Sequence, residues 1–132
     1  MHRISFVTGC TLAFLAIVLG AFGAHYLKTI FTPDILNSFE TGVRYQMYHA
    51  FVLIILGIYN RLRSQELKII YTLFFSGTVL FSGSIYLLSY FKSTETVGLT
   101  GLGILTPIGG ILMLLGWLLL IIYAIKHAHF FK

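Results

Sequence analysis

The chain has 132 residues, of which 58% are hydrophobic and only 10% are charged, and its mean hydropathy is +0.91. A soluble domain carries roughly 25% charged residues, so this composition excludes an ordinary soluble protein and indicates an integral membrane protein. Lys and Arg outnumber Asp and Glu by nine to four. The basic residues do not gather with aromatic residues on a polar surface, so nucleic acid is not a predicted partner.

Four apolar segments are predicted to cross the membrane, because each is long enough for a hydrocarbon core about 30 Å thick at about 1.5 Å per helical residue. The helices are expected at about residues 4–24, 41–60, 68–91 and 107–126. The predicted fold is all-α, a four-transmembrane-helix bundle that forms a single integral membrane domain over residues 1–132. The lone cysteine, Cys10, lies inside the first segment, so no internal disulfide is expected.

Helix-start signals precede the second and fourth segments. Thr32-Pro33-Asp34 places a capping Thr before a Pro at the first helical position. Apolar residues then recur at roughly helical spacing: Ile35, Leu36, Phe39 and Val43. This spacing predicts a short amphipathic helix on the outer surface between helices one and two, leading through Gly42 into helix two. Thr106-Pro107 repeats the signal and predicts the start of helix four.

Basic residues near the ends of the predicted helices indicate the orientation. One side of the membrane would carry Arg3, Arg61, Arg63, Lys68, Lys126 and Lys132. The other side would carry Lys28, Arg44 and Lys92. The side with more basic residues is the cytoplasmic one, so we expect a multi-pass protein of the cell (inner or plasma) membrane with both termini in the cytoplasm.

Small residues predict how the helices meet. In helix one they are spaced by four: Ala16, Gly20 and Ala24. Helix four offers a similar face: Gly109, Gly110 and Gly116. Such faces let backbones approach closely, either within one bundle or against a protein partner or a second copy of the chain. Membrane lipids are the other predicted partners.

Polar side chains gather in the outer half of the predicted bundle, and this region is the candidate binding site. Arg44 is central to it, because an ionisable group at the mouth of an apolar span is costly to keep. Residues four apart share a helical face, which pairs Arg44 with Glu40 and with Tyr48. The predicted ligand-binding residues are Arg44, His49, His25, Glu40, Tyr45, Tyr48, Ser82 and Ser84.

Each of these residues also has a structural interpretation. Glu40 and Arg44 either form an ion pair, or Arg44 joins His25 and His49 around an outward-facing cavity for an anionic or polar head group. His49 is either a core histidine bonded to Tyr45 or to a serine of helix three, or a group that relays protons. The serines Ser82 and Ser84 either bond the preceding turn of their own helix or contribute to the site.

Signatures of catalysis and metal binding are missing from the sequence. It has no glycine loop followed by Lys for phosphates, no paired His at metalloprotease spacing and no nucleophile elbow. His127 and His129 have no cysteine or carboxylate neighbours, so neither a metal site nor a cofactor is predicted. We therefore expect a protein that is not an enzyme.

Several motifs together resemble one family. They are Gly20–His25, Glu40–Ala50, Phe81–Leu87, Thr106–Gly110 and Gly116-Trp117. In this order, over nearly the whole chain, the sequence resembles the family called domain of unknown function 423 (DUF423), whose YgdD-like and YwdK-like members are similar to transmembrane protein 256. The resemblance implies a small multi-pass membrane protein without an established activity.

Two functions from different classes are predicted. The first is a non-enzymatic accessory or binding subunit that holds a partner protein, a lipid or a quinone-like ligand through the outer-half residues and the glycine faces. The alternative is a small oligomeric channel or transporter for protons or a small anion, which would use Arg44 and the histidines. Few acidic groups and no internal repeat accompany them, and both features count against the alternative.

Overall fold

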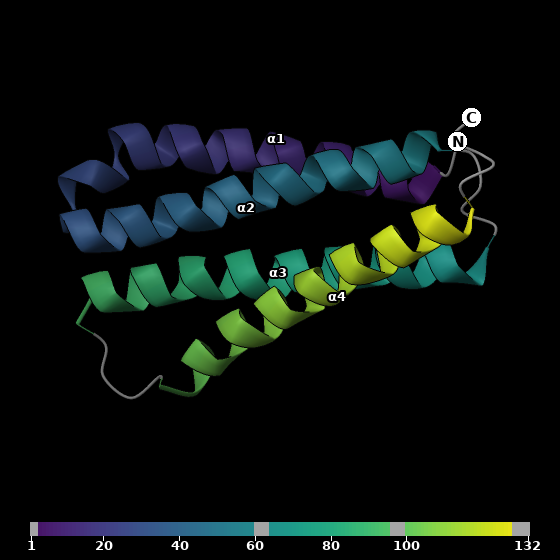
Figure 1. The fold of residues 1–132 in the computed structure, drawn as a ribbon. Helices are drawn as coiled ribbons and strands as arrows, with labels where there is room; N and C mark the ends of the chain where they lie inside the picture. Colours follow the sequence, from purple (N-terminus) through teal and green to yellow (C-terminus); the bar gives the residue numbers. More distant parts are fainter. Residues whose placement is uncertain (1–2, 60–63, 96–99, 128–132) are drawn as a thin grey trace.

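The computed structural model describes residues 3–59, 64–95 and 100–127, and the regular structure in these ranges is helical (Figure 1). The elements are α1 (Arg3–His25), η1 (Leu27–Thr29), α2 (Pro33–Ile58), α3 (Gln65–Ser93), η2 (Thr100–Ile104) and α4 (Leu105–Lys126). The all-α prediction is confirmed. Arg61, Arg63 and Lys132, which contribute to the predicted orientation, lie outside the described residues.

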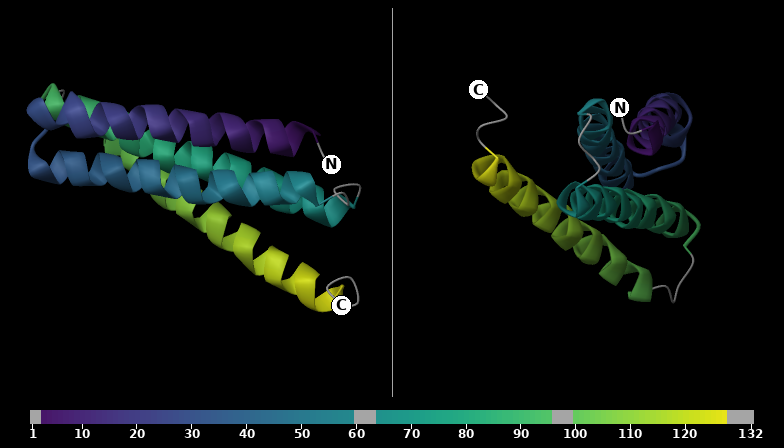
Figure 2. Two further views of the ribbon diagram at one scale, coloured as in Figure 1. Left: turned by 90° about the horizontal axis from the view of Figure 1, so that it is seen from above. Right: turned by 90° about the vertical axis from the view of Figure 1, so that its right-hand side faces the viewer.

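The helices form a row in chain order. α1 packs on α2, α2 on α3, and α3 on α4. Figure 2 shows α1 and α4 on opposite sides of the α2–α3 pair, and Figure 1 shows α4 crossing α3 obliquely. The predicted four-helix bundle is therefore open, because the two edge helices do not pack together to complete a ring.

Three segments of the described chain are long and apolar enough to cross a membrane: Arg3–Thr29, Gln65–Ser93 and Gly101–Lys126. α2 is not among them, although it lies between α1 and α3. It carries Glu40, Arg44, Gln46 and His49, whose polar side chains lower its hydropathy. The structure thus supports three membrane-spanning helices by length and composition.

The segment predicted as a separate amphipathic helix is the beginning of α2. Thr32 is the N-cap in an extended conformation and Pro33 is the first helical residue, as predicted, but the helix continues without a break to Ile58. Gly42, the predicted junction, lies inside it. A Cβ at Gly42 would come within 2.9 Å of the Tyr86 ring, so this glycine permits close packing of α3 instead of ending a helix.

Of the apolar face predicted for this segment, Phe39 is buried and Ile35, Leu36 and Val43 are partly buried. Phe39 packs in a cluster with Leu27 and Phe31 of the α1–α2 connection. A second cluster fills the other half of the molecule around Leu53, Leu56, Leu67, Ile70, Phe74 and Tyr123. The first cluster packs η1 against α2. The second cluster packs α2 against α3 and α4.

α4 begins at Leu105, two residues before the predicted start at about residue 107, and Thr106 is not its cap. Ile104 is the N-cap, and Thr106 and Pro107 lie in the first helical turn. Thr106 is therefore past the cap position, and its hydroxyl forms a 2.7 Å hydrogen bond with the Ser84 hydroxyl of α3. This bond links α4 to α3.

Glycines allow close backbone approach in both helical hairpins. Between α1 and α2, a Cβ at Gly57 would lie 2.6 Å from the Phe6 nitrogen, and one at Gly9 would lie 2.8 Å from the Ala50 oxygen. Between α3 and α4, a Cβ at Gly77 would lie 3.0 Å from the Gly109 oxygen. These faces pack within the chain.

The small-residue stripe predicted in α1 is only partly used in this packing. Ala16 is buried, and a Cβ at Gly20 would touch Val43 of α2 at 3.4 Å. Ala24, the third member, is exposed. The α1–α2 interface follows Gly9, Ala16 and Gly23, which recur at seven-residue intervals. Residues that follow Ala16 at intervals of four therefore turn progressively away from α2.

Candidate functional site

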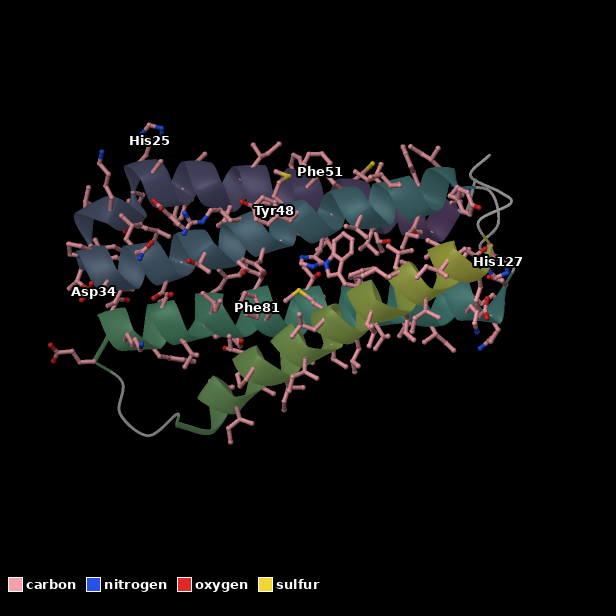
Figure 3. The ribbon with its side chains drawn as sticks, viewed as in Figure 1. His25, Asp34, Tyr48, Phe51, Phe81 and His127 are labelled. Atoms are coloured by element: carbon pink, nitrogen blue, oxygen red, sulfur yellow. The ribbon has the colours of Figure 1, made fainter. Side chains whose placement is uncertain are left out.

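The eight predicted site residues do not converge on one cavity. His49, Ser82 and Ser84 are buried between helices. The others are exposed: Arg44, Glu40, His25, Tyr45 and Tyr48. Figure 3 shows His25 at the end of α1 pointing away from the other helices, so it does not join Arg44 and His49.

Arg44 lies on the exposed side of α2 and bonds a hydroxyl of its own helix. Its Nη2 donates to Thr41 Oγ1 at 3.0 Å. Thr41 in turn donates to the backbone oxygen of Asn37 at 2.9 Å. The hydrogen-bond partner of Arg44 is therefore Thr41, in place of the predicted Glu40.

His49 is a core histidine bonded to Tyr45, as one of the two interpretations predicted. Its Nδ1 lies 2.8 Å from the Tyr45 backbone oxygen, and because that oxygen only accepts, Nδ1 carries the proton. Nε2 is then an acceptor, and it is buried without a hydrogen-bond partner. The rings of Phe74 and Trp117 surround it at centroid distances of 5.6 and 6.4 Å.

The two serines fasten α3 to its neighbours. Ser84 donates to the Phe81 oxygen of the preceding turn at 3.0 Å, as predicted. Ser82 differs from the prediction, because its hydroxyl donates across the interface to the Gly42 oxygen of α2 at 2.8 Å. Gly42 has no side chain to shield that oxygen, which explains why the interhelical bond forms.

Gln46 is a buried polar residue that is not among the predicted site residues. Its Nε2 donates to the Leu12 oxygen of α1 at 2.9 Å, and its Oε1 accepts from the Tyr86 hydroxyl of α3 at 2.9 Å. One buried amide therefore links three helices. The available signal was the amide itself, since a carboxamide among apolar residues of a membrane helix needs partners on other helices.

An apolar groove runs between α2 and α4 and has a volume of about 350 Å³. Its lining is Val52, Ile55, Leu56, Tyr59, Leu67, Trp117, Leu120, Tyr123 and Ala124. We call it the α2–α4 groove. It exists because the row of helices is open, so that α2 and α4 flank α3 without meeting along their length.

A more polar cavity lies near the end of the bundle that carries η1 and η2, and we call it the outer polar pocket. Its volume is about 270 Å³. Its lining is Ile35, Ser38, Thr41, Ile85, Leu88, Ser89, Lys92 and Thr106. Of the eight predicted site residues none lines it, but Arg44 is bonded to Thr41 on its wall.

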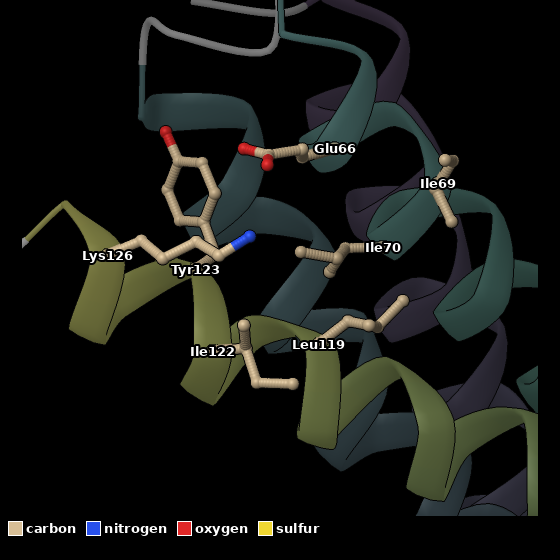
Figure 4. Close-up of a pocket in the computed structure, with 7 residues that line it drawn as sticks. All are labelled: Glu66, Ile69, Ile70, Leu119, Ile122, Tyr123 and Lys126. Carbon is tan, nitrogen blue, oxygen red and sulfur yellow. The ribbon is translucent and has the colours of Figure 1, made fainter.

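A third, smaller cavity of about 160 Å³ lies at the opposite end, between α3 and α4. Figure 4 shows Glu66 of α3 and Lys126 of α4 on its two sides, above a floor that includes Ile70 and Leu119. Opposite charges therefore flank an apolar opening at the predicted cytoplasmic end. Within the described ranges, no group of three or more His, Cys, Asp or Glu residues could hold a metal ion.

Comparisons with known proteins identify the family. The family described as "Protein of unknown function (DUF423)" matches residues 19–110. A UPF0382 membrane protein of Staphylococcus aureus is 36% identical over 126 residues, covering 96% of this chain and 98% of the relative. The UPF0382 membrane protein YwdK of Bacillus subtilis is 35% identical over 127 residues, with 95% and 98% covered. No solved structure matches the chain. The chain belongs to the DUF423 family of uncharacterised membrane proteins.

Proposed function

We propose that this protein is a non-enzymatic membrane protein that binds a lipid-like ligand in the α2–α4 groove. The observation that carries the proposal is the groove itself, an open space of about 350 Å³ lined almost wholly by apolar side chains. Sites for small apolar ligands have volumes of roughly 300–1,000 Å³ and predominantly hydrophobic and aromatic linings. The groove falls within that range.

The lining favours an elongated apolar ligand with a polar end. Aliphatic side chains such as Val52, Ile55 and Leu120 form most of the walls. Tyr59 and Tyr123 lie toward the predicted cytoplasmic end of the groove, where amphipathic rings meet lipid head groups. An acyl or isoprenoid chain would lie along the aliphatic walls with its polar end near these tyrosines.

The proposal includes α2 as a fourth membrane-spanning helix. Its 26 residues extend about 39 Å, more than a hydrocarbon core of about 30 Å. Packing between α1 and α3 supports this assignment, since Gln46 and His49 are turned into the protein and away from lipid. With four spans, both termini lie on one side, and the basic residues favour the cytoplasmic side of the plasma membrane.

Packing within the chain supports a ligand more than a partner helix at the glycine faces. Gly9, Gly57 and Gly109 each face another helix of the same chain. Likewise, Gln46 and Ser82 bond neighbouring helices, which supports a packing role for the polar interior. A partner protein would therefore contact the exposed edges of α1 or α4.

The experiment is photolabelling with a phospholipid that carries a diazirine in its acyl chain, in membranes that contain the protein. We expect labelled peptides from residues 52–59 and 117–124, and loss of most of this labelling in Ala124→Phe, which fills the groove. Ala21→Phe, on the exposed side of α1, is the matched control. Equal labelling of all lipid-facing helices, unchanged by Ala124→Phe, would contradict the proposal.

A further inference from the structure

We infer that the outer polar pocket is a binding site for a phosphate group. The first observation is Ser89, which lines the pocket, is only 2% exposed, and makes no side-chain hydrogen bond within the described residues. Its hydroxyl is not among the fully enclosed unpaired polar atoms, so it is open to a ligand in the cavity. The Ser89 hydroxyl is therefore a hydrogen-bond donor that is available to a ligand in the cavity.

The other hydroxyls of the pocket already donate hydrogen bonds within the protein. Ser38 donates to the Asp34 oxygen at 3.0 Å, and Thr41 donates to the Asn37 oxygen at 2.9 Å. The Ser84 proton goes to the Phe81 oxygen, so in the 2.7 Å bond between Thr106 and Ser84 it is Thr106 that donates. Ser89 is thus the lining hydroxyl whose proton is free for an acceptor.

Two cations accompany this donor. Lys92 lines the pocket from the last turn of α3. Arg44 reaches its wall from α2, since its guanidinium bonds the Thr41 hydroxyl at 3.0 Å. None of the eight lining residues is a carboxylate, and Asp34, in the first turn of α2, is exposed outside the lining. Glu40 and Glu95, at the same end of the molecule, also lie outside the lining, so the charged groups that line the pocket or bond its wall are both cations.

The N-terminus of α2 adds to the same field. α2 begins at Pro33 after the extended N-cap Thr32, and no side chain caps its first amides. Ile35, from the first turn of α2, lines the pocket, whereas α4 continues directly from η2. Backbone amides at a helix N-terminus favour anions. Lys92 offsets the opposite dipole of the α3 C-terminus, which ends nearby.

A phosphate fits this combination because it offers several strong acceptor oxygens to one hydroxyl, two cations and the N-terminal turn of α2. The phosphate of a membrane phospholipid and free inorganic phosphate share this chemistry. Ile85 and Leu88, which line the same cavity, would lie beside the apolar part of a lipid. This site shares no lining residue with the α2–α4 groove, so it stands independently of the proposed function.

The test uses the purified full chain in a phosphate-free, uncharged detergent, with Kd measured from ligand-induced shifts in Tm. The three probes are short-chain phosphatidylglycerol, inorganic phosphate, and a short-chain diacylglycerol that lacks phosphate. We expect phosphatidylglycerol to raise Tm and diacylglycerol to leave it unchanged. A comparable rise with inorganic phosphate would make the free anion the ligand, and no rise with either phosphate source would overturn the inference.

Substitutions in the lining test whether the phosphate binds in the outer polar pocket. Ser89→Ala and Lys92→Gln should each weaken phosphate binding about tenfold, the loss expected for one hydrogen bond to a charged group. Lys28→Gln in η1, an exposed cation at the same end, should leave Kd unchanged. Ser89→Ala removes no hydrogen bond of the free protein, so it should fold normally. A wild-type Kd in both pocket variants would overturn the inference.

Discussion

The Tyr86 hydroxyl of α3 donates a 2.9 Å hydrogen bond to the side-chain oxygen of Gln46, which lies on α2 and is itself bonded to α1. This relationship makes one buried carboxamide the point at which three helices are held in register. Its energetic weight can be measured, because the two side chains can be removed separately and together.

We expect Tyr86→Phe to lower the free energy of unfolding by about 1 kcal/mol, and Gln46→Leu by more, because the latter leaves the Tyr86 hydroxyl unpaired. The double variant should be less destabilised than the sum of the two single variants, since it removes donor and acceptor together. Unfolding in mixed micelles with increasing SDS would measure all three. Simple additivity would show that the two groups do not interact.

Glycine substitutions should separate close packing from helix propensity. Gly57→Ala places a methyl group 2.6 Å from the Phe6 backbone nitrogen, so the α1–α2 interface must move apart, at a cost of about 1–3 kcal/mol. Gly83→Ala meets nothing within 4 Å and should stabilise α3 by about 0.5–1 kcal/mol. The same SDS titration measures both. Equal effects of the two substitutions would refute the interface described for Gly57.

His49 should tolerate an aromatic replacement. Its Nε2 is buried and unpaired, so His49→Phe removes a polar atom that lacks a partner, while the ring contacts with Phe74 and Trp117 remain available. We expect His49→Phe to be at least as stable as the wild type and His49→Ala to lose about 2 kcal/mol or more through the cavity. Proton uptake into liposomes that disappears in the stable His49→Phe variant would revive the relay hypothesis.

The position of α2 can be tested by cysteine labelling in a Cys10→Ser background. If α2 crosses the membrane, Thr29→Cys and Thr94→Cys should react with a membrane-impermeant maleimide on intact cells, and Ser64→Cys only after permeabilisation. Reaction of Thr29→Cys and Ser64→Cys from the same side would show that α2 does not span. Labelling of Ser64→Cys alone on intact cells would reverse the predicted orientation.

The sequence predicts the helices better than their arrangement. Three spans follow from apolar runs of sufficient length, and their ends fall within a few residues of the prediction. In a membrane protein, however, lipid-facing and packed faces are both apolar, so hydrophobic periodicity does not reveal which face meets a neighbour. The open row of helices, and the merging of the predicted amphipathic helix into α2, depend on contacts such as Gly42 with Tyr86 that lie far apart in the chain.

For the same reason, the sequence does not reveal which polar residues of the candidate site are buried. Arg44 and Gln46 are two residues apart, which turns them roughly 200° from each other around a helix. One is exposed and the other buried, and the spacing alone does not say which. Ser84 bonds the preceding turn as predicted, whereas the bond of Ser82 to Gly42 and the outer polar pocket depend on the positions of neighbouring helices. Ser89 and Lys92 become neighbours of Thr41 only in the folded chain.

Packing between consecutive helices also bears on how the protein is made. Every extensive helix–helix interface joins neighbours in the chain: α1 with α2, α2 with α3, and α3 with α4. Each helix therefore meets its most extensive partner as soon as the next helix has been synthesised, and smaller contacts of α2 with α4, such as His49 with Trp117, form last. The glycine-lined hairpins α1–α2 and α3–α4 are the natural units of such stepwise assembly, and the bond between Tyr86 and Gln46 joins the second hairpin to the first.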